Sequence, residues 1–226
     1  AKMKKLLQAE RPDLVILNLV HKQITLSIID AIKEYDPKLP IFWTMHDLIA
    51  VCPAYTMRDS NNQICEKCLG GDYSHCVKNK CIKGSSLMSM LSKHEAEYIR
   101  KRKWYDKVDL FICPSEFYQK KLEEGKFTSS PIVTMRNPLP LNTRFGGGTK
   151  GDYVLYFGRL SEEKGVKTLL AAAKETGCKL YVLGTGPVEE ELKAYAKDMP
   201  NVEFKGFQTG KALEDYVKNS RCVVLP

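Results

Sequence analysis

A run of glycine and cationic residues stands between an apolar segment and an amphipathic one, at residues 157–165 (FGRLSEEKG). Gly158 permits close backbone approach, and Arg159 offers a planar fork that matches two phosphate oxygens. Lys164 falls at the predicted start of a helix, where its charge opposes the helix dipole unless an anion lies there. The run therefore predicts a diphosphate-binding site. The alternative is that Lys164 pairs with a neighbouring glutamate on the surface.

Two other apolar segments also end in residues that could contact a ligand. Gly184 and Gly186 lie in the sequence LGTGP, which predicts a tight turn that could pass under a ligand or serve only as a turn. His46 and Asp47 follow the apolar segment IFWTM. A histidine there could hydrogen-bond a substrate hydroxyl or stabilise developing charge, or it could only cap a loop.

Five of the eight cysteines lie within residues 52–81. Four of these predict a tetrahedral Zn²⁺ site, because two are spaced as C-x-x-C and the others follow closely. The four are Cys65, Cys68, Cys76 and Cys81. Cys52 and His75 are spare candidate ligands. Free reduced thiols, an iron–sulfur cluster and disulfides remain alternatives, and the three cysteines outside this region are expected to be small buried hydrophobes.

The elements that position these residues follow from the hydrophobic pattern. Apolar segments predict strands at 13–20, 40–45, 110–113, 132–135, 153–157, 179–183, 202–207 and 222–225. Helical spacing predicts helices at 24–35, 86–105, 115–124, 166–174, 188–197 and 212–219. Strands that alternate with single helices predict doubly wound parallel sheets covered on both faces. Ligands of such sheets bind at the carboxyl ends of strands, where the candidate residues fall.

Proline and glycine mark a division of the chain. Residues 137–140 (NPLP) cannot continue a helix, and three consecutive glycines follow at 146–148. We predict one α/β domain over 1–140, with a Cys-rich insertion at about 52–84. A linker over 141–151 and a second α/β domain over 152–226 are expected to follow.

Composition and charge narrow the class of protein. The chain has 226 residues, of which 43% are hydrophobic and 27% charged, which excludes wholesale disorder, collagen and a coiled coil. Residues 1–150 hold 24 basic and 16 acidic residues, whereas 151–226 hold 11 of each, so the net charge of +8 belongs to the first part. Such a surface could attract phosphates, nucleic acid or an anionic membrane, or could simply be solvated. The basic segment 100–105 (RKRKWY) has the same alternatives, with a solvated helix face favoured.

Residues 153–226 resemble the donor-binding domain of retaining glycosyltransferases of family 4, which have the two-domain GT-B fold with Rossmann-like domains. The matching segments are YFGRL to KG at 156–165, LGTGP at 183–187, VEFKGF at 202–207 and CVVLP at 222–226. Upstream, TMHD at 44–47, ICPS at 112–115 and RNP at 136–138 resemble the acceptor-side domain and linker of the same family. The segments occur in the expected order and cover most of the chain.

The resemblance implies specific roles for the charged candidates. Arg159 and Lys164, with Gly158 beside them, would hold the donor diphosphate. His46, with Asp47 as its neighbour, would face the transferred sugar. The implied reaction is transfer of a sugar from a nucleotide-diphosphate donor to a saccharide or lipid-linked acceptor, with retained anomeric configuration and no cofactor required for catalysis.

The resemblance also implies a nucleotide-binding loop and a cellular setting. Gly184, Gly186, Gly206 and Phe207 would lie near the nucleotide. The family carries two glutamates seven residues apart just beyond the strand that ends at Pro226, so we expect this chain to be an internal fragment of a longer enzyme. That enzyme would act in polysaccharide or glycolipid biosynthesis in the cytoplasm, with peripheral contact to the inner face of the membrane.

A second class of function fits the same residues. A zinc-stabilised, basic α/β module could bind nucleic acid or an anionic membrane without catalysis. No helix-turn-helix pattern and no RNP-like aromatic motif is present in the sequence, so a nucleic-acid partner is not expected.

Overall fold

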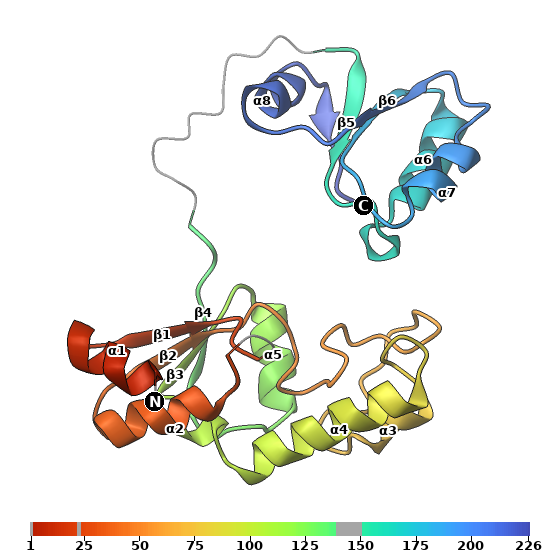
Figure 1. Ribbon diagram of the computed structural model, residues 1–226. Helices are drawn as coiled ribbons and strands as arrows, with labels where there is room; N and C mark the ends of the chain where they lie inside the picture. The colour runs from red at the N-terminus through yellow and green to blue at the C-terminus, as the bar shows by residue number, and fades with distance from the viewer. Residues whose placement is uncertain (1, 22–23, 139–150) are drawn as a thin grey trace. The chain divides into compact units, whose positions relative to one another are not determined.

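The computed structural model describes residues 2–21, 24–138 and 151–226 and divides the chain into two compact units, Ala1–Pro138 and Leu139–Pro226 (Figure 1). We call these unit 1 and unit 2 and describe each by itself. The division falls within the Asn-Pro-Leu-Pro run that predicted a boundary. The expected linker, 141–151, lies outside the described residues except for Gly151.

Unit 1 contains a four-stranded parallel sheet with the strand order β1-β2-β3-β4. The strands are β1 Val15–Asn18, β2 Ile41–Thr44, β3 Leu110–Cys113 and β4 Ile132–Thr134. The helices are α1 Lys2–Glu10, α2 Ser27–Tyr35, α3 Ser74–Lys78, α4 Ser86–Lys101 and α5 Glu116–Glu124, with a 3₁₀ turn η1 at Tyr105–Lys107. Trp43 of β2 lies beside Phe111 of β3, and both are buried with ring centroids 5.9 Å apart. Strands buried in this way appear in the sequence as continuous apolar runs.

Local chemistry sets the ends of the unit 1 helices. Ser115 caps α5, because its hydroxyl accepts a hydrogen bond from the Tyr118 amide at 3.4 Å. The helix predicted over 86–105 ends earlier, at Lys101, and Lys103 has a φ of 54°, which a continuing α-helix does not allow. The helix predicted from residue 24 begins only at Ser27.

Unit 2 contains a second four-stranded parallel sheet with the order β7-β6-β5-β8. The strands are β5 Tyr153–Phe157, β6 Lys179–Leu183, β7 Val202–Gly206 and β8 Cys222–Val223. The helices are α6 Val166–Thr176, α7 Glu189–Tyr195 and α8 Gly210–Lys218, with a 3₁₀ turn η2 at Glu162–Lys164 before α6. The order places β5 in the interior of the sheet, and its side chains pack on both faces.

The helices of unit 2 cover opposite faces of its sheet (Figure 1). Tyr156 and Val182 pack with α6 and α7 on one face. Leu155 and Leu183 pack on the other face, together with Tyr216 of α8. This is the doubly wound arrangement that the alternating pattern predicted.

The three cysteines predicted to be buried differ in exposure. Cys113 in β3 is fully buried, Cys178 is half-buried, and Cys222 is exposed. The prediction is wrong for Cys222 because β8 is an edge strand that pairs only with β5 among the described strands. None of the helices in the described ranges has both the length and the apolar character needed to cross a lipid bilayer.

Candidate functional site

The main candidate site is a pocket at the carboxyl ends of the unit 2 strands. A cavity of about 410 Å³ opens between the residues that follow β5, β6 and β7. Four predicted residues line it, and these are Gly158, Arg159, Gly184 and Phe207. Thr185, Gln208 and Thr209 also line it and were not singled out from the sequence. Parallel strands end at one edge of their sheet, and this brings segments about 25 residues apart into one wall.

Two turns form the base of this pocket by packing backbone against backbone. The Gly158 amide donates to the Leu183 carbonyl at 3.0 Å, and the Gly184 amide donates to the Gly206 carbonyl at 2.7 Å. A Cβ on Gly184 would lie 1.9 Å from the Gly158 carbonyl oxygen. Glycine is therefore required here because the two turns leave no room for a side chain.

Gly186 and Gly206 act on the pocket indirectly, since neither belongs to its lining. A Cβ on Gly186 would lie 2.1 Å from the Leu160 carbonyl oxygen, so this glycine keeps the turn after β6 close to the turn after β5. The Leu160 amide donates to the Thr185 carbonyl at 2.9 Å, which ties the same two turns together. Gly206 supplies the carbonyl that holds Gly184.

The two predicted phosphate-binding cations are exposed and available. Neither Arg159 nor Lys164 forms an ion pair with another described residue, so the alternative in which Lys164 pairs with a neighbouring glutamate is not observed. Lys164 ends η2, just before α6, and lies outside the pocket lining. The pKa of Glu163 is lowered, first because the Ser161 hydroxyl donates to it at 2.5 Å and further because Arg159 and Lys164 are near. Both cations are therefore close enough to Glu163 to stabilise its negative charge.

His46 and Asp47 lie just beyond β2 in unit 1. The His46 Nε2 atom is 3.1 Å from Oδ1 of Asn18, which ends the neighbouring strand β1. His46 is otherwise exposed, so its ring is held at one nitrogen and open to a ligand. One oxygen of Asp47 accepts from the Ile49 amide at 3.0 Å, an arrangement that shapes the loop. Asn18 was not predicted as a functional residue.

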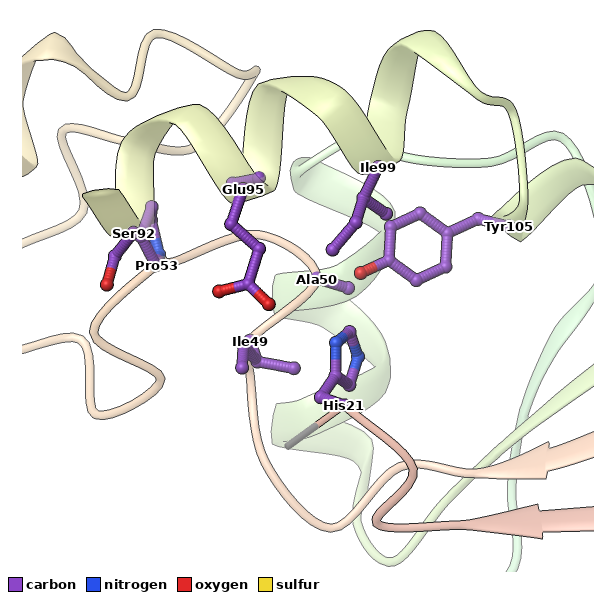
Figure 2. Close-up of a pocket in the computed structure, with 9 residues that line it drawn as sticks. His21, Ile49, Ala50, Pro53, Ser92, Glu95, Ile99 and Tyr105 are labelled. Carbon is purple, nitrogen blue, oxygen red and sulfur yellow. The ribbon is translucent and has the colours of Figure 1, made fainter. Parts of the chain in front are cut away.

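A second recess in unit 1 has no room for a substrate (Figure 2). It is lined by His21, Ile49, Glu95, Ile99 and Tyr105, among others, and has a volume of about 20 Å³. That volume holds about one water molecule. Burial raises the pKa of the Tyr105 phenol well above its ordinary value, so this tyrosine stays neutral. The recess is a packing feature.

The cysteines of the insertion gather in one place. Cys68 and Cys76 are buried, whereas Cys65 and Cys81 are half-buried, and all are free thiols. Burial, followed by neighbouring thiols, raises the pKa of Cys68 and of Cys81 to about 12. Cys52, one of the two spare candidate ligands, is among those neighbours. As they stand, no three His, Cys, Asp or Glu side chains in the described ranges form a metal-ligating group.

The basic segment 100–105 is solvated in part and anchored in part, since Lys101, Arg102 and Lys103 are exposed whereas Trp104 and Tyr105 are buried. Arg100 donates to the carbonyls of Gly125 and Lys126 at 3.1 and 2.9 Å. Arg102 and the buried Trp104 both donate to Asp30 at 2.8 Å. These side chains therefore act in the fold.

Known proteins resemble this chain in sequence over residues 144–226 and in fold over nearly its whole length. The family described as "Glycosyl transferases group 1" matches residues 144–226, the part of the chain that contains the pocket. No curated protein matches the chain. Solved structures do match, although their sequence identity is low.

Three of these structures share the fold over nearly the whole chain. Anabaena HepE in complex with UDP is 16% identical with a TM-score of 0.57, and the match covers 99% of this chain and 56% of that one. S. aureus TarM, in complex with Fondaparinux, alpha-GlcNAc-glycerol and UDP, is 16% identical with a TM-score of 0.55 over 94% of this chain and 38% of that one. The lipopolysaccharide outer core galactosyltransferase WaaB is 18% identical with a TM-score of 0.54 over 99% of this chain and 52% of that one.

These likenesses confirm the expected fold class. The chain has two α/β units with parallel sheets, as do glycosyltransferase structures of the GT-B type. The chain spans between 38% and 56% of the length of these three proteins.

Proposed function

We propose that this chain carries the donor-binding unit of a glycosyltransferase that takes a sugar from a nucleoside-diphosphate donor. The observation that carries the proposal is the pocket of unit 2, formed by Arg159 and tightly packed glycine turns within the segment that matches group 1 glycosyl transferases. UDP is named as a ligand in the HepE and TarM structures, which have the same fold. A nucleoside diphosphate is therefore the ligand class that we assign to the pocket.

The diphosphate would be bound by Arg159 and Lys164. A guanidinium binds two phosphate oxygens at once, and an ammonium adds a point charge. Both cations lack an ion pair with any described residue, so binding an anion breaks no such contact. Each charge-assisted hydrogen bond contributes about 1.5–3 kcal/mol.

The chemical step would depend on stabilising the leaving diphosphate. The bond between the sugar C1 and the phosphate oxygen breaks, the acceptor oxygen bonds to C1 on the same face, and the acceptor proton passes to the departing phosphate. This path retains the anomeric configuration. The charge that develops on the diphosphate would be met by Arg159 and Lys164, and cations already positioned at that charge would lower the barrier.

In unit 1 we assign His46 as a hydrogen-bonding partner of the transferred sugar. Its ring is oriented by Asn18 at 3.1 Å and is otherwise exposed. Asp47 would keep the loop in the conformation that presents His46, since its carboxylate accepts from the Ile49 amide. The acceptor would be a saccharide or a lipid-linked saccharide, as in polysaccharide or glycolipid biosynthesis.

The proposal includes peripheral contact with a membrane at the cytoplasmic face. Apolar side chains at the start of α4 are exposed, and Leu87 and Leu91, which are one turn apart, are 61% and 55% exposed. Lysines at 83 and 93 flank them in the sequence. Sedimentation with anionic vesicles should recover the protein, and the double variant Leu87→Ser/Leu91→Ser should stay in the supernatant. Equal sedimentation of both proteins would contradict this contact.

Nucleotide binding provides the direct test of the donor site. Calorimetric titration of the whole chain with UDP and other nucleoside diphosphates should give saturable binding to at least one of them. Arg159→Ala and Lys164→Ala should each weaken that binding about 10- to 100-fold, the equivalent of one charge-assisted bond. Lys167→Ala is the matched control, because Lys167 lies one turn further along but is paired with Glu191 at 2.8 Å.

Two results would overturn the assignment. One is the absence of binding for every nucleoside diphosphate tested at millimolar concentration. The other is an equal effect of all three lysine and arginine variants, since the unpaired cations would then be no different from a paired surface lysine.

A further inference from the structure

The insertion between β2 and α4 has an unusual interior. Residues 52–85 contain one short helix, α3, and one isolated bridge between Arg58 and Ile64. A connection of this length with so little regular structure needs another source of order. Its own small core is formed by Cys68, Tyr73 and Cys76, with Cys81 packed against them. The interior of the segment therefore consists largely of thiols.

Backbone contacts bring these thiols together. The Leu69 amide donates to the Glu66 carbonyl at 3.0 Å, so the C-x-x-C pair lies on a tight turn. The Cys81 amide donates to the Cys76 carbonyl at 3.1 Å, which closes a second turn with a cysteine at each end. Two turns that each carry a pair of cysteines are a common construction of a tetrahedral zinc site.

The contacts of the candidate residues distinguish expected zinc ligands from residues to which we assign no ligand role. The Cys65 sulfur already accepts from the Asn79 side-chain amide at 3.7 Å, the kind of contact that orients a metal-bound thiolate. His75 is turned to Asp72 at 3.3 Å. Cys52 belongs to the main core of unit 1 and not to the cluster around Tyr73, whereas Cys81 packs against both. We therefore treat Cys52 and His75 as bystanders.

We propose that Cys65, Cys68, Cys76 and Cys81 bind one structural Zn²⁺ ion. Zinc favours four thiolates in a closed tetrahedral site, and such a site supplies folding energy to segments too small for a hydrophobic core. On binding, the four thiols release four protons and the site carries a net charge of −2. Residues 52–84 contain five basic and three acidic residues, a net charge of +2 that balances the site.

The site is completed as the metal binds. The described thiols are gathered but do not yet form a ligating group, so the two turns must close on the ion. Closure couples binding to ordering of the insertion. Arg100 adds further positive charge at this place, since a Cβ on Gly71 would lie 1.6 Å from its Nη1 atom.

Metal content tests the proposal directly. The intact chain, purified under reducing conditions without chelator, should contain about one zinc per molecule by plasma mass spectrometry. Cys68→Ser and Cys76→Ser should each lower that content to less than about 0.1 equivalent. Cys222→Ser, an exposed cysteine of unit 2, and Cys52→Ser should both keep the full content.

A second measurement guards against variants that simply fail to fold. Removing zinc from the wild-type protein with a chelator should speed tryptic cleavage within residues 52–84 about tenfold, and added zinc should restore the slow rate. The proposal is overturned if the wild-type protein holds less than about 0.1 equivalent of zinc after incubation with the metal. Iron in place of zinc, disulfides between these cysteines, or loss of zinc in Cys52→Ser would overturn it equally.

Discussion

Gly184→Ala is the substitution that tests most sharply how the unit 2 pocket is built. Gly184 has a φ of +127°, and an added Cβ would lie 1.9 Å from the Gly158 carbonyl oxygen and 2.9 Å from its carbon. Real Cβ atoms stay at least 3.0 Å from such atoms. Both partners are backbone, so no side-chain rotation relieves the clash. The turns after β5 and β6 must move apart.

The expected cost combines two effects. An alanine in this backbone conformation costs about 1–3 kcal/mol, and displacing closely packed groups costs about 1–3 kcal/mol more. The free energy of unfolding should therefore fall by about 2–6 kcal/mol. Because the displaced turns form the base of the pocket, the affinity for a nucleoside diphosphate should fall as well, at temperatures where unit 2 remains folded.

Gly177→Ala isolates the backbone contribution. Gly177 lies in the same unit with a φ of +67°, and an added Cβ would meet nothing within 4 Å. This control should cost only about 1–2 kcal/mol and leave nucleotide binding unchanged. Denaturant titration and calorimetric titration of both variants give the comparison. If Gly184→Ala is no more destabilising than Gly177→Ala and binds the nucleotide equally well, the packing argument is refuted.

Three further predictions concern individual hydrogen bonds. Burial alone would raise the pKa of Asp30, but hydrogen bonds from Lys107, Trp104 and Arg102 outweigh it and hold the pKa at about 2. Asp30→Asn should therefore cost about 2 kcal/mol at pH 7 in denaturant titrations, and this difference should shrink as the pH falls from 3.8, the ordinary pKa of an aspartate, toward about 2. Asn18→Ala should remove the hydrogen bond that orients the His46 ring. The kcat should then fall about fivefold, which corresponds to the loss of about 1 kcal/mol, with the donor KM unchanged. Tyr156→Phe removes the hydroxyl that donates to the Arg159 carbonyl at 3.0 Å, so unfolding free energy should fall by about 1 kcal/mol and nucleotide affinity by less than in Arg159→Ala.

Each of these predictions has an outcome that contradicts it. Asp198→Asn is the control for Asp30, because the Asp198 side chain is 87% exposed and its carboxylate lies 3.9 Å from Lys197. Equal effects of the two substitutions would show that the donors around Asp30 stabilise nothing. An Asn18→Ala variant that changes only the donor KM would show that Asn18 does not orient His46. A Tyr156→Phe variant as weak in binding as Arg159→Ala would mean that the hydroxyl itself contacts the ligand.

The sequence predicted the fold where burial is complete. The strands β5 and β6 have the predicted bounds, because both are covered on two faces along most of their length and are correspondingly apolar. The insertion 52–85 gave no periodicity, and α3 was not predicted. The end of α4 was also missed. Lys103 adopts a left-handed conformation there, which a glycine would have indicated in the sequence and a lysine does not.

The candidate site was predicted in part, for a similar reason. Glycines that follow apolar segments indicate turns, but the contact between Gly184 and Gly158 depends on two turns 26 residues apart, so no local pattern contains it. Asn18 could have been found, since it ends β1 and His46 follows β2, and neighbouring parallel strands bring their carboxyl ends together. The hydrogen bonds that anchor the basic segment were missed because sequence alone does not show that Asp30 lies beside it.

The distribution of ion pairs explains how residues 151–226, which have no net charge, can attract phosphate. Residues 151–226 contain equal numbers of basic and acidic residues, so their summed charge offers no attraction. Seven of the eleven cations in that range form ion pairs with described residues. The four others are Arg159, Lys164, Lys174 and Arg221. Lys174 lies in the last turn of α6 and Arg221 just before β8, which places both at the amino-terminal edge of the sheet. Arg159 and Lys164 are therefore the two unpaired cations at the carboxyl edge, where the pocket lies. An anion is drawn to that edge because its cations are not already neutralised, and screening by salt weakens such short contacts less than it weakens attraction by a distant surface charge.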